Sequence, residues 1–252
     1  MRLMKRILSA AAVLALSASL LVGCSSGTAS SVPVSASSAA ESTVSSVEET
    51  ASSAVDENEA AAAQLLNDLT GSYQELWPVI LADEYKQTWL DDCTALVGED
   101  NAEAAFEKLS SMVTGDVYGE DAVKAYANGG GAYFCGFTNS LAILTFDGET
   151  STISGTDKDG NVLFSHTYHY IGMEPVRGLY EFESDDADSG EFTYFFLAPD
   201  TSAETYHIEF RYGSDAEALS QYDAGEYAYW VASGISTDCD QTMIDNCIEL
   251  FC

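Results

Sequence analysis

Seven short runs of β-prone residues follow one another between residues 132 and 212, and they limit what this chain can fold into. The connections between the runs are short and contain turn residues, as in Asp147-Gly148 and Arg177-Gly178. Short connections join antiparallel neighbours, so the runs predict a meander. A meander has to pair or cover its edges, and a small closed barrel achieves this. The expected strands are 132–138, 141–146, 150–155, 162–170, 179–183, 191–197 and 205–212.

Helical patterns lie on both sides of this β region. Gly129-Gly-Gly131 marks the change from helix to strand, and the helical pattern returns after Gly213. Pro78 is expected to end any regular element that reaches it. The predicted fold is therefore mainly β with flanking helices: a lipocalin- or calycin-like antiparallel barrel capped by amino- and carboxy-terminal helices. The expected helices are 60–69, 82–97, 101–113, 119–128, 214–221 and 237–251.

The amino-terminal end has the features of a secretion signal, with a basic start followed by an apolar run. The run ends in Leu21-Val22-Gly23-Cys24, which resembles the bacterial lipobox. Residues 1–23 are thus interpreted as a lipoprotein signal peptide, and Cys24 as the lipidated first residue of the mature chain. An ordinary signal peptide with a chance cysteine is the alternative. The composition of residues 24–56, rich in Ser, Ala and Glu, predicts a flexible tether. Residues 57–252 are expected to form one domain.

The charge balance excludes several partners. The chain has 41 acidic and 9 basic side chains, for a formal net charge of −32. Nucleic acid and anionic lipid surfaces both attract basic proteins, so no nucleic-acid partner is expected. Membrane contact is expected only through the lipid anchor, on the extracytoplasmic side of a bacterial cell membrane. The sequence also has no P-loop, nucleophile elbow, zinc-protease or dinucleotide motif, and no enzymatic activity is predicted.

Five cysteines follow Cys24, and their spacing does not predict a thiolate metal site because no pair has C-x-x-C spacing. Two of them lie eight residues apart in one expected helix, which disfavours a bond between them. Either of these two could reach a cysteine nearer the amino terminus. Buried free thiols and one disulfide both remain open at this point. The five residues are Cys93, Cys135, Cys239, Cys247 and Cys252.

The last expected strand, 205–212, carries the candidate chemistry. Apolar and polar residues alternate along it, so the imidazole of His207 and the carboxylate of Glu209 share one face. Residues two apart on a strand have Cα atoms about 6.5–7 Å apart, so both side chains can reach one cation. The alternative is a solvent-exposed strand face on which Glu209 pairs with Arg211.

The chain resembles the ZinT (YodA-like) zinc-binding proteins in several motifs, which occur in the same order over most of residues 65–251. That family has a lipocalin-like barrel capped by helices, and it also forms the carboxy-terminal part of some surface zinc-binding lipoproteins. The resemblance implies this fold and a zinc-binding function. The motifs are Gly71-x-Tyr73-Gln74-x-x-x-Pro78, Tyr168-x-Tyr170-x-Gly172, Arg177-Gly178, Phe182-Glu183, His207-x-Glu209-x-x-x-Gly213 and Tyr229-Trp230.

The resemblance also implies a ligand set. In the family, an H-x-H pair on this strand and a third histidine near the end of the preceding strand hold the ion. Here His207 matches the first histidine, Glu209 stands at the second, and Asp200 is the nearest candidate for the third. His169, which lies three residues from His166 and hence on the opposite strand face, is a further candidate. This harder donor set predicts weaker zinc binding and better competition by manganese or calcium.

We therefore expect a lipid-anchored extracytoplasmic protein that binds Zn²⁺, or another divalent cation, in the mouth of the barrel. It would support metal capture or uptake, with a metal ABC-transport system as its partner. One alternative is a calycin-type carrier of a small apolar ligand, suggested by 14 Tyr and 11 Phe. Another is a surface interaction module with a decayed metal site. The acidic turn of Asp185, Asp186 and Asp188 predicts a solvated turn rather than a calcium loop.

Overall fold

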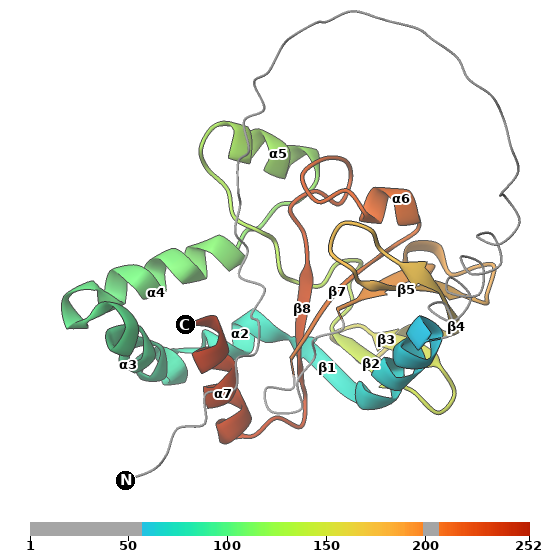
Figure 1. Cartoon of the computed structure of the whole chain (residues 1–252), viewed down its shortest axis with the longest axis horizontal. Coiled ribbons are helices and arrows are strands. Elements are labelled where there is room, and N and C mark those ends of the chain that lie inside the picture. Colours follow the sequence, from blue (N-terminus) through green and yellow to red (C-terminus); the bar gives the residue numbers. More distant parts are fainter. Residues whose placement is uncertain (1–56, 199–206) are drawn as a thin grey trace, which may run out of the picture. The chain divides into compact units, whose positions relative to one another are not determined.

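Eight antiparallel strands close into a barrel in the computed structural model, which describes residues 57–198 and 207–252 (Figure 1). Each strand pairs with its neighbours in sequence, and β8 pairs with β1 to close the ring. This confirms the predicted barrel with flanking helices. The predictions for the signal peptide, Cys24, the tether and Asp200 fall outside the described residues. The strands are β1 (Gly71–Glu75), β2 (Ile143–Asp147), β3 (Thr152–Thr156), β4 (Val162–Met173), β5 (Tyr180–Ser184), β6 (Tyr194–Leu197), β7 (His207–Gly213) and β8 (Ala232–Ser236).

The two strands that close the barrel are the ones the sequence did not reveal. β1 is short and lies between two helices, and β8 is built mostly of small residues, so neither shows strong alternation. The expected strand 132–138 is wrong: within it, Phe134 makes only isolated bridges, to Thr114 and to Trp230. Ring closure thus depends on backbone pairing between weakly β-prone segments, which tertiary context favours more than local propensity does.

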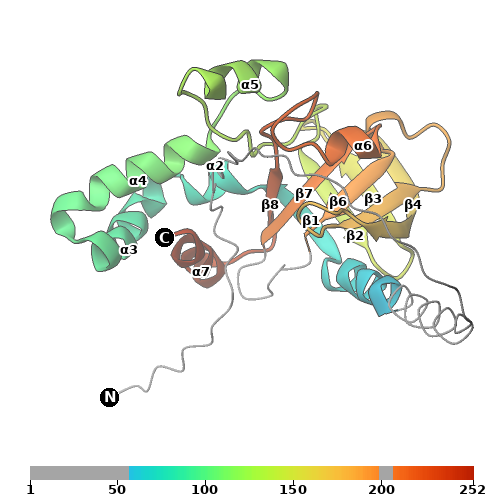
Figure 2. The same ribbon diagram turned by 45° about the horizontal axis from the view of Figure 1, so that its top comes forward.

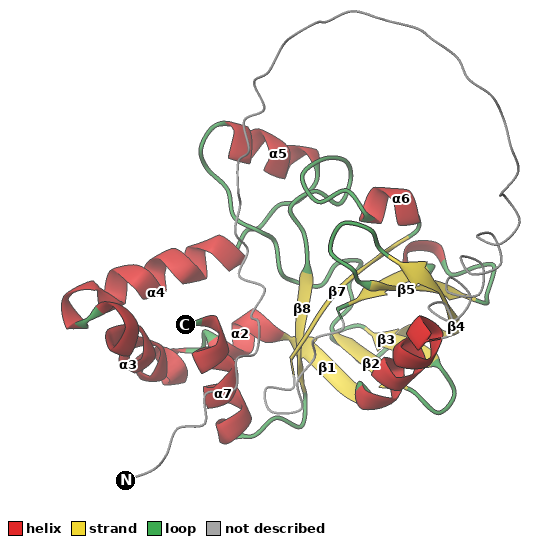
Figure 3. Ribbon diagram, in the orientation of Figure 1, coloured by secondary structure: helices red, strands yellow, loops and turns green. Residues whose placement is uncertain are grey.

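The helices lie outside the barrel wall (Figure 3). Pro78 does not end a regular element but occupies the third position of α2, where an amide hydrogen has no partner within the helix. No helix within the described ranges is both long and apolar enough to cross a bilayer. Beyond an amino-terminal helix at 57–68, the helices are α2 (Leu76–Ile80), α3 (Lys86–Val97), α4 (Glu99–Val113), α5 (Glu120–Ala127), α6 (Ala216–Leu219) and α7 (Gln241–Phe251).

Aromatic side chains fill the inside of the barrel. Phe195 packs against Tyr212 with ring centroids 5.4 Å apart, and Phe137 packs edge-on against Phe210 at 5.3 Å. Leu66 and other apolar residues of the helix at 57–68 join the same cluster and cover it. Each large ring removed from water stabilises the fold by about 1.5–3 kcal/mol, so this barrel core is the main source of stability. We call this cluster of buried residues, which includes Phe137, Phe195, Phe210 and Tyr212, the barrel core.

A second cluster lies outside the barrel, where α2, α3 and α7 pack beside β8 (Figure 2). Trp89 of α3 is fully buried in this cluster, and its Nε1 donates a hydrogen bond to the carbonyl oxygen of Ile80 at 2.6 Å. Asp240 caps α7 by accepting a hydrogen bond from the amide of Met243. We call this set the helical cluster; its buried members are Leu76, Trp77, Ile80, Trp89, Cys135, Ile235, Ile244, Cys247 and Ile248.

Candidate functional site

The two faces of β7 point in different directions. Phe210 and Tyr212 belong to the barrel core, so alternation sends His207 and Glu209 to the outer face of the barrel. The pairing with β8 agrees, because His207 lies opposite Ile235, a member of the helical cluster. The structure therefore corrects the expected position in the barrel mouth. Aromatic rings fill the inside, and the imidazole and carboxylate lie at the junction of barrel and helices.

The imidazole of His207 is buried beneath the last turn of α7. Only 8% of the residue is exposed, and its ring meets the ring of Phe251 edge-on, with centroids 5.6 Å apart. The amphipathic pattern of α7 produces this cover, because the helix buries Ile244 and Ile248 against the barrel wall. A metal ion held by His207 would thus lie at a partly dry junction, where electrostatic attraction is stronger than in open water.

Glu209 is half-buried two residues further along β7, opposite Ser233 of β8. Its carboxylate lies close enough to Cys135 to affect that thiol. Burial, and then the negative charge of Glu209, raise the pKa of Cys135 to about 12. Glu209 is thus a half-buried carboxylate near a buried thiol, and carboxylate oxygens are common ligands of divalent cations.

A pocket of about 320 Å³ is lined in part by Cys135 and by residues of β1, α2 and α4. Its lining combines apolar side chains with polar groups, among them one carboxylate. The carboxylate is that of Glu75, whose Oε1 also accepts a hydrogen bond from the amide of Phe137 at 2.6 Å. The other lining residues are Trp77, Pro78, Leu81, Val113, Thr114, Gly115, Phe134 and Gly136.

Arg211 completes the outer face of β7 and is fully buried. Its guanidinium donates hydrogen bonds to the carbonyl oxygens of Leu219 and Tyr227, and Nη2 lies 3.4 Å from the carbonyl oxygen of Gln221. Burial lowers the pKa of Arg211 to about 10, which leaves the group charged at neutral pH. The solvent-exposed strand face considered from the sequence is thus wrong. Arg211 binds the loop after α6 and fixes it over the barrel.

His207 and Glu209 lie on the same face of β7, but the described residues alone do not form a complete metal site. Within 57–198 and 207–252, no three His, Cys, Asp or Glu side chains are placed to hold one ion. Asp200, the expected third ligand, lies outside these ranges. The ligand set of His207, Glu209 and Asp200 consequently stays a prediction, and its two described members are consistent with one shared ion.

His169 is not part of this pair. It is exposed on the outward face of β4, and its Nδ1 lies 2.7 Å from Oδ1 of Asp185. β4 pairs with β3 and β5, whereas β7 pairs with β6 and β8, so the two strands are not neighbours. His166, three residues earlier, points to the face that also carries Phe164 and Tyr168.

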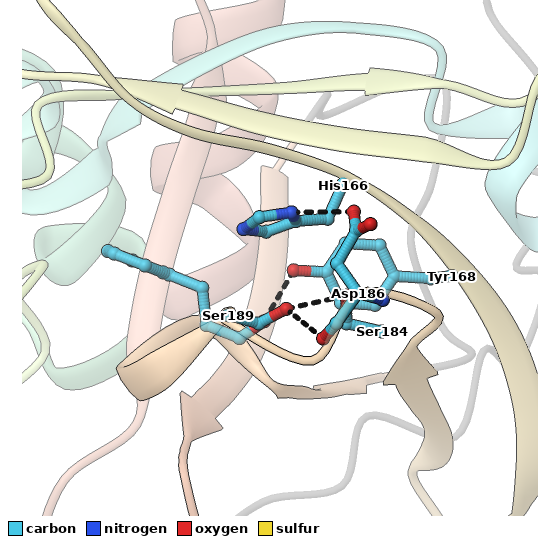
Figure 4. A network of polar contacts seen from close by, with 6 residues as sticks. His166, Tyr168, Ser184, Asp186 and Ser189 are labelled. Carbon is cyan, nitrogen blue, oxygen red and sulfur yellow. Dashed lines mark hydrogen bonds and ion pairs between the residues drawn. The ribbon is translucent and has the colours of Figure 1, made fainter.

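His166 belongs to a polar network that sequence reasoning did not identify (Figure 4). Its Nδ1 lies 2.8 Å from Oδ2 of Asp186. The hydroxyl of Ser189 donates to the carbonyl oxygen of Asp186 at 2.8 Å, and the amide of Asp186 donates to the hydroxyl of Ser184 at 3.1 Å. The carboxylate beside Nδ1 holds the ring of His166 in one orientation.

One signal could have revealed this network. The hairpin of β4 and β5 places Tyr168 opposite Ser184, so the acidic residues that follow Ser184 must come level with His166. Asp185 and Asp186 each meet one histidine, and the side chains of Asp185, Asp186 and Asp188 are all exposed, in keeping with the predicted solvated turn. Counting the register back from the turn would have been wrong by one residue, because the pairing of β4 with β5 shifts between Tyr170 and Gly172.

Several solved structures are similar to this chain. No family model matches the sequence, and no curated protein matches it. The zinc-bound ZinT-like domain of AdcA from Streptococcus pneumoniae aligns with a TM-score of 0.46 and 16% identity, over 74% of this chain and 89% of that domain. Zinc-bound AdcA from the same organism aligns with a TM-score of 0.43 and 14% identity, over 73% of this chain. The match spans 34% of the AdcA chain.

Proposed function

We propose that this protein binds a divalent metal ion, zinc in the first place, at the start of β7. The observation that carries the proposal is the outward pair of His207 and Glu209, half-buried or buried where α7 covers the barrel wall. An imidazole and a carboxylate two residues apart can share one ion at about 2 Å from each donor atom. Asp200, which precedes β7, is the proposed third ligand.

The donor set determines which ions would compete. One imidazole with two carboxylates is harder than a set of three imidazoles, so manganese and calcium compete with zinc better here than at an all-histidine site. The formal net charge of −32 raises the local concentration of every cation and selects none of them. Selectivity must therefore come from His207, the one nitrogen ligand in the proposed set.

The proposed cellular role follows from the amino-terminal sequence. Cys24 of the lipobox-like motif would carry the lipid, and residues 24–56 would tether the barrel domain to the outer face of the membrane. In that position a metal-binding domain captures ions and delivers them to a metal ABC-transport system. No part of this role requires catalysis, in keeping with the absence of enzyme motifs in the sequence.

Calorimetric titration of zinc into the purified full-length chain tests the metal site. The chain has only three histidines, so each can be replaced in turn. We expect His207→Ala to weaken zinc binding about a hundredfold, which is about 2.7 kcal/mol. His166→Ala and His169→Ala are matched controls that each remove one imidazole and should retain the affinity. Equal loss in all three variants, or no zinc binding by the unmodified chain, would refute the assignment.

A small apolar ligand is a second candidate function, favoured by the pocket between Trp77 and Phe134. This pocket lies outside the barrel, in contrast to the interior site of a calycin-type carrier. Its lining contains both apolar and polar groups, as is common in pockets for small organic molecules. Native mass spectrometry of the purified chain distinguishes the two candidates, because a bound organic molecule without metal supports the carrier.

A further inference from the structure

We propose that Cys93 and Cys252 form a disulfide that ties the end of α7 to α3 and so holds Phe251 against His207. The Sγ atoms of the two residues lie 3.6 Å apart. Cys93 is buried in the middle of α3, and Cys252 follows the last residue of α7 and is half-buried. The two helices pack against each other, so the contact is part of a built interface and not a chance approach.

The geometry requires little movement. A disulfide bond is about 2.05 Å long, so the sulfur atoms need to approach by about 1.6 Å, which side-chain rotation can supply. The structure shows no other contact between two thiols within its described residues. Cys135 and Cys247 are buried at separate places in the helical cluster, and Cys239 is half-buried before α7. The choice of partners is therefore specific.

The chemistry needs an oxidant of the disulfide class, such as oxidised glutathione or a disulfide-carrying oxidoreductase outside the cytoplasm. The thiolate of Cys252, the more accessible of the pair, attacks the oxidant and releases one thiolate. The thiolate of Cys93 then attacks the Cys252 sulfur of the mixed disulfide and releases the second. Two protein thiols lose two protons and two electrons, and the oxidant is reduced to two thiols.

The consequence for His207 follows from its neighbours. Phe251 directly precedes Cys252 and meets the imidazole edge-on at 5.6 Å. In the reduced protein no covalent bond holds this end of α7, which packs through the buried residues Ile244, Cys247 and Ile248 and through the ring of Phe251 on Trp77. In the oxidised protein a covalent bond holds it, and access to His207 narrows. The effect on a metal ion rests on the proposed function, whereas the disulfide itself does not.

Peptide mapping tests the pairing directly. The full chain is incubated with oxidised glutathione, its remaining thiols are alkylated, and the digest is analysed by mass spectrometry. We expect the peptides of Cys93 and Cys252 joined and lighter by two hydrogen atoms, with Cys239 alkylated. Alkylation of both Cys93 and Cys252, lasting glutathione adducts on either residue, or a bond from Cys252 to Cys239 would overturn the proposal.

Thermal unfolding gives a second and independent readout. Closing the long loop between residues 93 and 252 should raise Tm by about 5–10 °C over the reduced protein. Cys252→Ser, at a half-buried position that tolerates serine, should abolish this difference, while the matched control Cys239→Ser should retain it. Equal Tm values for oxidised and reduced wild-type protein would overturn the proposal.

Zinc titration of the same samples separates the two proposals. If oxidation slows or weakens zinc binding in the wild type and in Cys239→Ser but not in Cys252→Ser, the covalent tie controls access to His207. If none of the samples binds zinc while the mapped disulfide is present, the proposed function fails and the disulfide stands. Identical zinc binding by oxidised and reduced wild type would refute the control of His207 by α7.

Discussion

The two faces of β7 are both covered, but by different means. On the inner face, Phe210 and Tyr212 pack among aromatic rings that are enclosed by the barrel itself. On the outer face, His207 lies under Phe251, and Arg211 lies under the loop that follows α6. The inner face therefore gains its stability from apolar area, whereas the outer face depends on hydrogen bonds and on the helix and loop that pack over it.

This difference indicates where function can arise in a barrel of this size. The interior is filled with side chains and provides stability, so a ligand site has to form where the wall meets its covering helices. Polar groups at that junction are partly removed from water, so their electrostatic interactions are stronger than in open solvent. His207 and Glu209 both lie there, one beneath the end of α7 and the other near Cys135.

The largest expected effect comes from the inner face. Phe210→Ala removes a fully buried ring that contacts Phe137, Phe195 and Tyr212, and should lower the free energy of unfolding by about 3–5 kcal/mol. Urea unfolding followed by tryptophan fluorescence measures it. Phe251→Ala is the matched change on the outer face and should cost about 1–2 kcal/mol, because that ring is only half-buried. An equal loss of unfolding free energy in Phe210→Ala and Phe251→Ala would show that the two faces of β7 do not differ in this way.

A smaller loss is expected from the outer face at Arg211. Arg211→Met keeps most of the apolar stem but leaves the buried carbonyl oxygens of Leu219 and Tyr227 without their donor, at a cost of about 2–3 kcal/mol. Arg211→Lys should recover only part of this loss, because one ammonium group cannot reach both carbonyls in the guanidinium geometry. Urea unfolding of both variants provides the measurement, and full recovery by lysine would argue against the fork-like contact.

The sequence predicted the alternation of β7 correctly but not what covers its polar face. Period-two patterning separates two faces without saying which one points inward, and the covering helix α7 begins only at Gln241, whereas β7 ends at Gly213. Charge patterning suggested solvent for Arg211, whereas its true partners are backbone carbonyl oxygens, which leave no mark in a sequence. The barrel was predictable because turn residues mark the ends of most of its strands in the sequence.

The candidate site was predictable only in part. Motif spacing selected His207 and Glu209, which the structure places on one face, but His169 lies on a strand that is not a neighbour of β7. The contact of Cys93 with Cys252 joins residues from opposite ends of the domain. Such long-range pairs depend on helix packing, and local propensity carries no information about them.

The smallest expected effect is on the pKa of Cys135 when the charge of Glu209 is removed. The measurement shows whether that charge acts on a thiol buried near the outer face of β7. Burial is the main reason that the pKa of Cys135 rises to about 12, and the charge of Glu209 is the second. Glu209→Gln removes that charge, so the pKa of Cys135 should fall while burial keeps it above its ordinary value. Since only the thiolate is alkylated, alkylation of Cys135 at pH 8.5 should become about two- to fivefold faster.

Peptide mapping of Cys135 over time measures the rate, and Glu107→Gln on the exposed side of α4 is the matched control. An unchanged rate in Glu209→Gln would show that water screens the carboxylate, and the outer face of β7 would then be no drier than ordinary surface.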